Sequence, residues 1–179
     1  MTLAQLFSIA KSLTFLFTAS FGACVAAYAG QPVAKMAVFD FELEHGSQVP
    51  GTPDHHDAEQ ARLRGVSERL RDNLARAGFA VIDIAPIAKK AAAAKLTACG
   101  NCADGFAEEI GADYAFTGAV YKVSELILSM NVVVRDAKTA QPVTSAIVDF
   151  RGNTDESWRR AIDYLYRNVL SQRLEKLKK

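Results

Sequence analysis

The chain has 179 residues, with 21 Lys and Arg against 20 Asp and Glu, and half of its residues are hydrophobic. That length fits one ordinary domain, with or without a targeting segment. A net charge of +1 argues against a strongly basic nucleic-acid binder and against an acidic disordered chain. Three cysteines are too few for a disulfide scaffold, so the composition indicates a mixed globular domain.

Residues 1–29 have the pattern of a secretory signal peptide. They contain one basic residue, Lys11, no acidic residue, and an apolar stretch at 13–27. The tripeptide at 27–29, Ala-Tyr-Ala, has the small residues that a signal peptidase accepts. Cleavage there would leave 30–179 as a single periplasmic α/β domain without a membrane span.

Two other interpretations of this segment are weaker. An uncleaved anchor is disfavoured because the apolar stretch barely reaches spanning length and is diluted by Ser and Thr. Lipoprotein anchoring at Cys24 is less favoured because Phe21 stands where such sites usually carry Leu. Each interpretation makes the protein an exported one, and we expect it in the periplasm.

The first elements after this segment are a strand, a loop and a helix. β-Branched and aromatic residues predict a strand at 35–43, and Pro-containing turns make 45–57 a loop, so 34–57 is strand and loop. Apolar residues at helical spacing predict a helix over 58–78, ended by Gly78. Its buried stripe would consist of Leu63, Val66, Leu70 and Leu74.

The middle of the chain is predicted to alternate a short strand with helices. Residues 79–84 form a second strand, which Pro86 stops. Helical segments are predicted at 87–96 and at 103–110, the second of them ended by Gly111.

Residues 113–150 are predicted as a β-meander. Its strands are at 113–123, 125–135 and 143–150, with a turn at 136–140. The second strand would bury one face, formed by Leu126, Leu128, Met130, Val132 and Val134. The outer strand of a meander must end the sheet, so its edge, or the sheet face beside it, is a candidate docking surface.

A last helix is predicted over 154–175. Asn153 followed by Glu156 has the spacing of a capping box. The apolar stripe of this helix would be Trp158, Ile162, Leu165 and Val169.

The predicted order is therefore β-α-β-α-β-β-β-α, an α/β (α+β mixed) fold. Because each helix has one apolar stripe to bury, the economical arrangement is one mixed sheet of about five strands, covered on a face by helices. Strands joined through helices should be parallel neighbours, and the last three should be antiparallel.

Five segments of the chain carry a family pattern. They are Met36-Ala-Val-Phe-Asp-Phe41, a helix ending in Leu-x-x-Ala-Gly-Phe, Val81-Ile-Asp83, Glu109-Ile-Gly-Ala-Asp-Tyr-Ala-Phe-Thr-Gly118 and Asp136-Ala-Lys-Thr-Ala140. This layout resembles the periplasmic α/β domain found in the amino-terminal part of TolB and in the lipoproteins CsgG and LpoB, and a set of uncharacterised exported proteobacterial proteins. The resemblance covers roughly 35–175, and Ala140 stands where these proteins usually carry Gly. It implies an interaction or assembly module in the periplasm and brings no catalytic residues.

Cys99 and Cys102 are the sharpest local feature of the chain. Thiols at this spacing beside a helix start can close a disulfide, act in thiol-disulfide exchange or bind a metal. In an oxidising periplasm a structural disulfide is the favoured interpretation. The strand and aromatic residue that precede the motif in thioredoxin-like proteins are missing here.

Two other groups of polar residues are candidate sites. His55 and His56, with His45 upstream, are weak metal-ligand candidates, because neighbouring loop histidines point in different directions. The helix at 58–78 carries several arginines among acidic residues, which indicates a mixed solvated face. These arginines are Arg62, Arg64, Arg69, Arg71 and Arg76.

The sequence thus predicts a non-enzymatic periplasmic accessory or protein-interaction module, which binds an envelope or periplasmic protein and no nucleic acid. No cofactor and no catalytic residue are predicted, since no phosphate loop, nucleophile elbow or HExxH motif is present. The alternative is an exported thiol-disulfide or metal-handling protein that uses the CxxC motif at 99–102.

Overall fold

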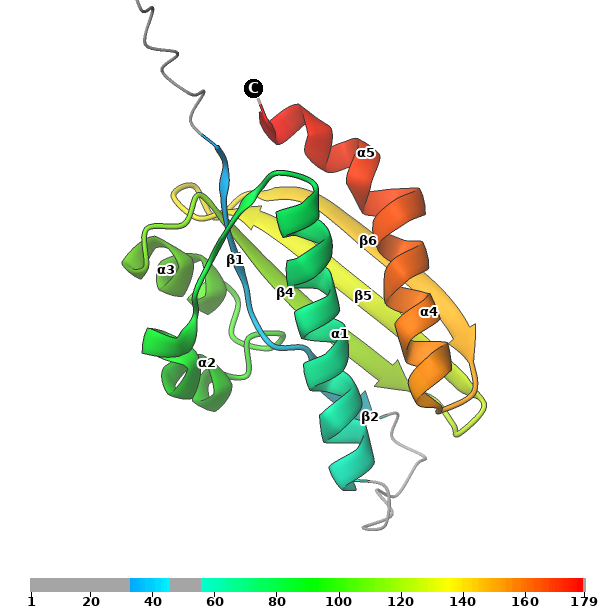
Figure 1. Cartoon of the computed structure of the whole chain (residues 1–179). Helices are drawn as coiled ribbons and strands as arrows, with labels where there is room; N and C mark the ends of the chain where they lie inside the picture. The colour runs from blue at the N-terminus through cyan, green and yellow to red at the C-terminus, as the bar shows by residue number, and fades with distance from the viewer. Residues whose placement is uncertain (1–32, 46–55, 179) are drawn as a thin grey trace, which may run out of the picture.

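The computed structural model describes residues 33–45 and 56–178, which form one sheet with helices packed against it (Figure 1). The predicted signal peptide at 1–29, with Cys24, and the loop residue His55 lie outside the described residues. The predicted α/β fold with a mixed sheet is confirmed, with six strands in place of about five.

The elements lie close to their predicted positions. The strands are β1 (Lys35–Val38), β2 (Glu42–His45), β3 (Ala80–Ile82), β4 (Tyr114–Lys122), β5 (Ile127–Asp136) and β6 (Pro142–Arg151). The helices are α1 (His56–Arg76), α2 (Ala88–Ala94), α3 (Cys102–Glu109), α4 (Asp155–Leu165) and α5 (Ser171–Leu174). A π-helical turn at Tyr166–Leu170 joins α4 to α5, and 3-10 turns lie at Ala85–Ile87 and Glu175–Lys178.

The strands are ordered β3-β1-β4-β5-β6, and β2 pairs with β4 beyond the end of β1. β1 lies parallel to both β3 and β4, and β4, β5 and β6 form an antiparallel meander. Both features agree with the sequence prediction. The sheet therefore has one short edge at β3 and one long edge at β6.

The predicted first strand is broken into β1 and β2, which corrects the strand count. Between them the amide of Phe41 donates to Ser67 Oγ on α1 at 2.9 Å instead of extending the ladder. The Phe41 ring lies over Gly118, where an added Cβ would be 2.5 Å from ring carbons. A side-chain acceptor from a distant helix causes the break, so no local pattern shows it.

Helices cover both faces of the sheet, whereas a single covered face was expected. The crossover β1-α1-β3 runs one way along the sheet, and the crossover from β3 through α2 and α3 to β4 runs back over β1. Because both parallel crossovers favour the right hand, their helices fall on opposite faces. Alternate residues of β4 accordingly divide between two cores, Phe116 with α1 and Ala115 with α3.

The two cores differ in size. The larger lies under α1, α4 and α5, which cross the front of the sheet in Figure 1, and includes Leu70, Met130 and Trp158. The smaller lies under α2 and α3 and is rich in alanine. This second face is only partly covered by helices, so Tyr121 of β4 and Ile147 of β6 are exposed.

The last helix begins one residue later than predicted. Thr154 is its N-cap and forms a capping box with Ser157, in place of the predicted Asn153–Glu156 pair. The π-helical turn then shifts the apolar stripe, so that Leu170 is fully buried and Val169 only partly. Both differences arise because Asn153 has partners elsewhere and because the π turn adds a residue to one turn.

Two turn residues have features that the sequence does not predict, exposure in one and backbone conformation in the other. Leu126, predicted on the buried face of its strand, lies in the β4–β5 turn with 71% of its surface exposed. Ala140 has φ +55°, in the left-handed region that favours glycine. Ala140 therefore occupies a turn position whose backbone conformation is less favourable for alanine than for glycine.

Candidate functional site

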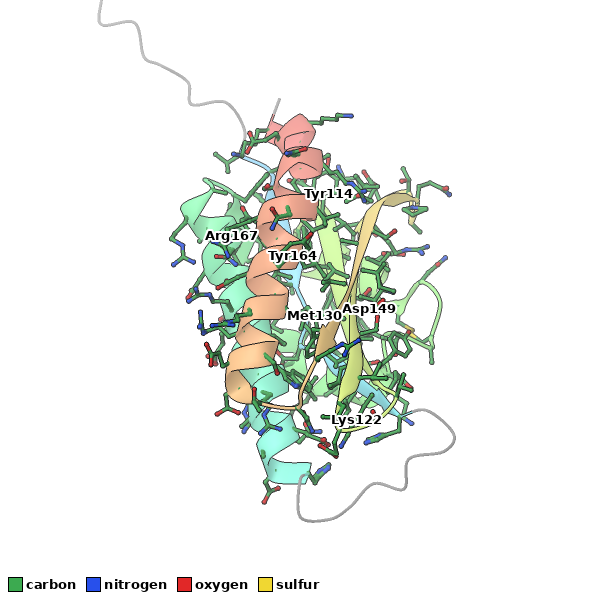
Figure 2. All side chains as sticks on the ribbon, turned by 90° about the vertical axis from the view of Figure 1, so that its right-hand side faces the viewer. Tyr114, Lys122, Met130, Asp149, Tyr164 and Arg167 are labelled. Atoms are coloured by element: carbon green, nitrogen blue, oxygen red, sulfur yellow. A yellow bond between two sulfur atoms is a disulfide. The ribbon has the colours of Figure 1, made fainter. Side chains whose placement is uncertain are left out.

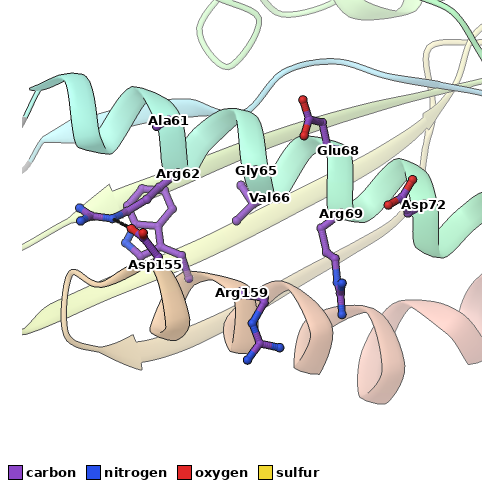
Figure 3. A pocket seen from close by; sticks show the side chains of 10 residues that line it. Ala61, Arg62, Gly65, Val66, Glu68, Arg69, Asp72, Asp155 and Arg159 are labelled. Carbon is purple, nitrogen blue, oxygen red and sulfur yellow. Dashed lines mark hydrogen bonds and ion pairs between the residues drawn. The ribbon is translucent and has the colours of Figure 1, made fainter.

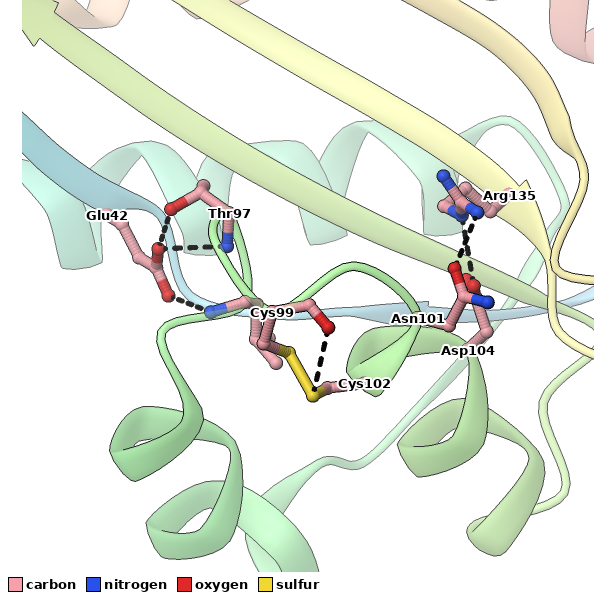
Figure 4. The surroundings of a disulfide bond; sticks show 8 residues. Glu42, Thr97, Cys99, Asn101, Cys102, Asp104 and Arg135 are labelled. Atoms are coloured by element: carbon pink, nitrogen blue, oxygen red, sulfur yellow. Dashed lines mark hydrogen bonds and ion pairs between the residues drawn. A yellow bond between two sulfur atoms is a disulfide. The ribbon is translucent and has the colours of Figure 1, made fainter.

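The CxxC motif lies in the connection between α2 and α3 (Figure 4). The Sγ atoms of Cys99 and Cys102 are joined at 2.09 Å, and both residues are half-buried against the alanine-rich core. The Glu42 carboxylate on β2 accepts hydrogen bonds from the amides of Leu96 at 2.6 Å and Thr97 at 3.1 Å. The connection is therefore held to the sheet close to the disulfide.

The other side of the same connection is held by Arg135 of β5. Its Nε donates to Asp104 Oδ2 at 2.9 Å, and its Nη2 donates to Asn101 Oδ1 at 3.0 Å (Figure 4). A cavity of about 140 Å³ between the connection and the sheet is lined in part by Arg135, Gly100 and Tyr121. These contacts hold the residues on both sides of the motif in place. The role of the disulfide as a structural bridge stays a prediction.

The histidines do not come together with other ligand-type residues in the part of the chain that the structure describes. His56 begins α1 and is exposed, and His45 ends β2, also exposed. Within 33–45 and 56–178 no group of three or more His, Cys, Asp and Glu could hold a metal ion.

A buried ionic cluster that the sequence analysis missed lies at the end of β4. Lys122 Nζ donates to Glu59 Oε1 of α1 at 2.6 Å and also pairs with Glu125. The side chains of Lys122 and Glu59 are 3% and 4% exposed. Asn153 Nδ2 donates to Glu59 at 2.8 Å and to Glu125 at 2.9 Å, while Trp158 Nε1 donates to Asn153 Oδ1.

Burial and pairing act in opposite directions on this cluster. Burial by itself raises the pKa of Glu59, but hydrogen bonds from Lys122 and Asn153 outweigh it and lower that pKa. Burial likewise disfavours the charged form of Lys122, but its bonds to Glu125 and Glu59 leave the pKa of the ammonium raised. Both groups are therefore held charged, and the cluster joins α1, β4 and the start of α4 at one end of the molecule.

Several arginines of α1 bridge to neighbouring elements, where the sequence predicts a mixed solvated face. Arg69 forms two hydrogen bonds with the Asp163 carboxylate of α4, at 2.8 and 2.9 Å. The bonds from Arg69 lower the pKa of Asp163, and they outweigh burial, which by itself would raise it. Arg62 Nε donates to Asp155 at 2.7 Å, and Arg71 Nη2 donates to the Val38 carbonyl at 2.8 Å.

A groove of about 440 Å³ runs between α1 and α4 (Figure 3). Its floor includes Val66 and Trp158, and its rim carries Arg159 together with the paired Arg62 and Arg69. The exposed Gly65 lies in the middle of α1 with no atom within 4 Å of where a Cβ would stand. The rim has cations and carboxylates in equal number, so its charge favours no class of ligand.

β6 forms a long free edge of the sheet. The amide of Gly152, directly after β6, donates to the carbonyl of Leu126, directly before β5, so in this register the even-numbered residues of β6 direct their backbone groups to β5. Because this direction alternates along a strand, Ile147, Asp149 and Arg151 direct their N–H and C=O groups away from the sheet. Ser145 also faces outward, and its carbonyl accepts a hydrogen bond from Arg173 Nη1, which in the described part of the chain is the one hydrogen bond to the outer backbone groups of β6.

A groove of about 560 Å³ runs beside this edge, between β6 and α4. Figure 2 looks toward this side of the molecule, with Asp149 on β6 and Tyr164 on α4. Val148 and Phe150 of β6 line the groove with Ala161 and the exposed Tyr164. The free backbone groups and this groove together have the features that an added strand needs: a ladder to continue and a place for alternate side chains.

The fold and this edge define a small α/β domain whose mixed sheet ends in a long unpaired strand edge at β6. The chain belongs to the family described as protein of unknown function DUF2380, whose model matches residues 34–170. Among the described residues, no helix is long and apolar enough to cross a membrane.

The chain is also similar in architecture to several solved structures. Lipoprotein GNA1162 from Neisseria meningitidis has 14% identity and a TM-score of 0.49, with 80% of this chain and 93% of that one covered. The LpoB C-terminal domain from Escherichia coli has 14% identity and a TM-score of 0.47, covering 70% and 87%. The PelC dodecamer from Paraburkholderia phytofirmans has 18% identity and a TM-score of 0.47, covering 79% and 87%. No curated protein sequence matches the chain.

Proposed function

We propose that this chain is a non-enzymatic protein-interaction module of the periplasm, which binds a partner protein by strand addition at the outer edge of β6. The observation that carries the proposal is the row of outer backbone groups at Ile147, Asp149 and Arg151, beside a groove lined by α4. Natural sheets usually shorten, cover or charge such an edge, because it pairs readily with another strand. A ten-residue edge with an exposed isoleucine is of the kind that binding proteins use.

The periplasmic location rests on the signal-peptide pattern of residues 1–29. The absence of an enzymatic role is supported by what the buried charged groups do. Lys122 and Glu59, Arg69 and Asp163, and Arg135 with Asp104 each join two elements of the fold. Their bonds hold helices to the sheet or to one another, which is a structural use of the charges.

Site-specific photo-crosslinking in cells tests the proposal. The full chain would carry a photoreactive amino acid at Asp149 on the edge, or at the exposed Lys89 on α2 as a control position. We expect a protein adduct from position 149 and none from position 89, because only the former lies on the binding edge.

A pair of substitutions at Ile147 separates backbone from side chain. Ile147→Pro removes an N–H that faces away from β5, so the fold keeps its ladder while the edge is blocked. Ile147→Thr keeps the N–H and a β-branched side chain. The adduct should disappear with Ile147→Pro and persist with Ile147→Thr. Adduct formation that is equal in both variants would contradict strand addition, with circular dichroism confirming that both are folded.

A further inference from the structure

The outer residues of β6 are compatible with a second copy of the same strand. Ile147 lies in the middle of the strand and is 64% exposed, although it is a large apolar residue. Ser145 and Asp149 lie two residues to either side, on the same face and with the same backbone direction. Ser145 and Asp149 are equally far from Ile147. When two antiparallel copies meet at Ile147, the hydroxyl of each therefore lies opposite the carboxylate of the other.

An antiparallel pair of β6 strands, related by a two-fold axis through Ile147, brings complementary groups together. Ile147 would then lie opposite Ile147 of the second copy, as an apolar cross-strand pair. Ser145 would lie opposite Asp149 of the second copy, where its hydroxyl can donate to the carboxylate, and the symmetry gives this pair twice. No like charges face one another in this register.

Neighbouring registers are less favourable. Moving the axis by one residue sets Ile147 against Ser145 in one direction and against Asp149 in the other. Moving it to Asp149 sets two carboxylates face to face, which destabilises a strand pair. Moving it to Ser145 centres the pair on the carbonyl that Arg173 already binds.

The contact from Arg173 is compatible with pairing through Ile147. The Arg173 side chain is exposed, so releasing the Ser145 carbonyl returns its guanidinium to water. In the proposed register the amide of Asp149 of the second copy takes its place at that carbonyl. The arginine therefore covers one carbonyl of the edge in the single molecule and gives it up to a partner strand.

We propose that a second copy of this chain binds along β6, antiparallel and with the two-fold axis through Ile147, so that the sheets of two molecules become continuous. The inference rests on the proposed function, because it names the partner of the same edge. The open face of the meander then extends across both copies, with the two Ile147 side chains at its centre.

Cysteine crosslinking tests the register. In the full chain, Ile147→Cys should give a covalent dimer with a short bifunctional thiol reagent, because the two Cβ atoms lie about 5 Å apart in such a pair. Asp149→Cys alone should give none, since its own copy would be about 13 Å away along the strand. Ser145→Cys mixed with Asp149→Cys should give a mixed dimer. The unsubstituted chain, with its own cysteines, is the control.

Molar mass by light scattering over a range of concentrations tests the association itself. We expect a dimer for the unsubstituted chain and for Ile147→Thr, and a monomer for Ile147→Pro. A monomer at every concentration, or self-crosslinking of Asp149→Cys in place of Ile147→Cys, would overturn the inference. If the chain is monomeric but its crosslink to another protein at position 149 is lost in Ile147→Pro, only the second copy is refuted. If that crosslink is also insensitive to Ile147→Pro, the proposed function fails as well.

Discussion

At the scale of single residues, one contact explains why position 118 is a glycine. Gly118 lies in β4 under the Phe41 ring, in the place where the first strand of the chain breaks between β1 and β2. Phe41 is buried, so its ring has little freedom to move aside. The absence of a side chain at position 118 is what allows the break to pack.

We therefore expect Gly118→Ala to destabilise the fold by about 1–3 kcal/mol, as overpacking of a core does. Urea denaturation measures this change. In a Phe41→Leu background the same substitution should cost clearly less, because the ring carbons that meet the new methyl group are gone. An equal cost in both backgrounds would show that the contact with Phe41 is not the cause.

The Lys122–Glu59 pair is a second place where a single side chain contributes strongly to the stability of the fold. Removing one partner of a buried pair leaves a charge without compensation, and we expect Lys122→Met to cost about 3–5 kcal/mol of unfolding free energy. Lys90 and Glu109, paired at 2.6 Å but half exposed, give a matched control. Lys90→Met should cost less than about 1 kcal/mol. Similar losses in the two variants would refute the assignment of Lys122 to a buried cluster.

At the scale of elements, α1 contains a glycine that its own packing does not require. Gly65 is exposed in the middle of a 21-residue helix, and nothing lies within 4 Å of an added Cβ. Glycine in a helix interior has more backbone freedom to lose on folding than alanine does. We expect Gly65→Ala to stabilise the protein by about 0.5–1 kcal/mol, measured by urea denaturation. A loss of stability would mean that the added methyl group meets neighbouring atoms in the groove between α1 and α4.

The connection between α2 and α3 is the element that the disulfide closes. Chain-entropy arguments for a loop this short give about 2 kcal/mol or less, so the Cys99→Ser/Cys102→Ser variant should lose up to that amount. Thermal unfolding with and without reductant measures the loss in both proteins. Reductant should lower the unfolding temperature of the parent chain and leave the variant unchanged. Insulin-reduction activity that disappears in the variant would instead favour the thiol-disulfide alternative.

At the scale of the whole molecule, charged pairs join α1 to the sheet and to α4, and this makes stability depend on pH. The pKa values of Glu59 and Asp163 are both lowered in the folded protein. A carboxyl group whose pKa is lowered by folding stabilises the folded state above its unfolded pKa, and this contribution is lost as the pH falls. Lys122 has a raised pKa, so its contribution is lost only at high pH.

The unfolding free energy should therefore decrease as the pH is lowered from about 6 to about 3. Urea denaturation at a series of pH values measures this slope. Asp163→Asn should flatten the curve, because it removes one of the carboxyl groups responsible. Glu109→Gln, on an exposed pair, is the control and should leave the slope nearly as it is. A curve of unchanged slope in Asp163→Asn would contradict the role given to the Arg69 pair.

The sequence by itself determined the local elements and their order. Alternation of apolar residues predicted β5, and helical spacing predicted α1 and α4, because these periods follow from the geometry of one strand or one helix. The parallel and antiparallel pairings also followed, since connection length limits how two strands can be joined. For the candidate site, the sequence predicted an open outer strand of the meander.

Only the tertiary structure decided which distant residues meet. Ser67 takes the Phe41 amide and breaks the first strand, and Asn153 leaves its predicted cap to join Glu59. The groove beside β6 likewise needs α4 to return over that strand. The first two contacts join residues that lie 26 and 94 positions apart in the chain, and a local pattern contains no information about such partners. Long-range packing, with its few specific polar contacts, is therefore what turned a predicted set of elements into this particular surface.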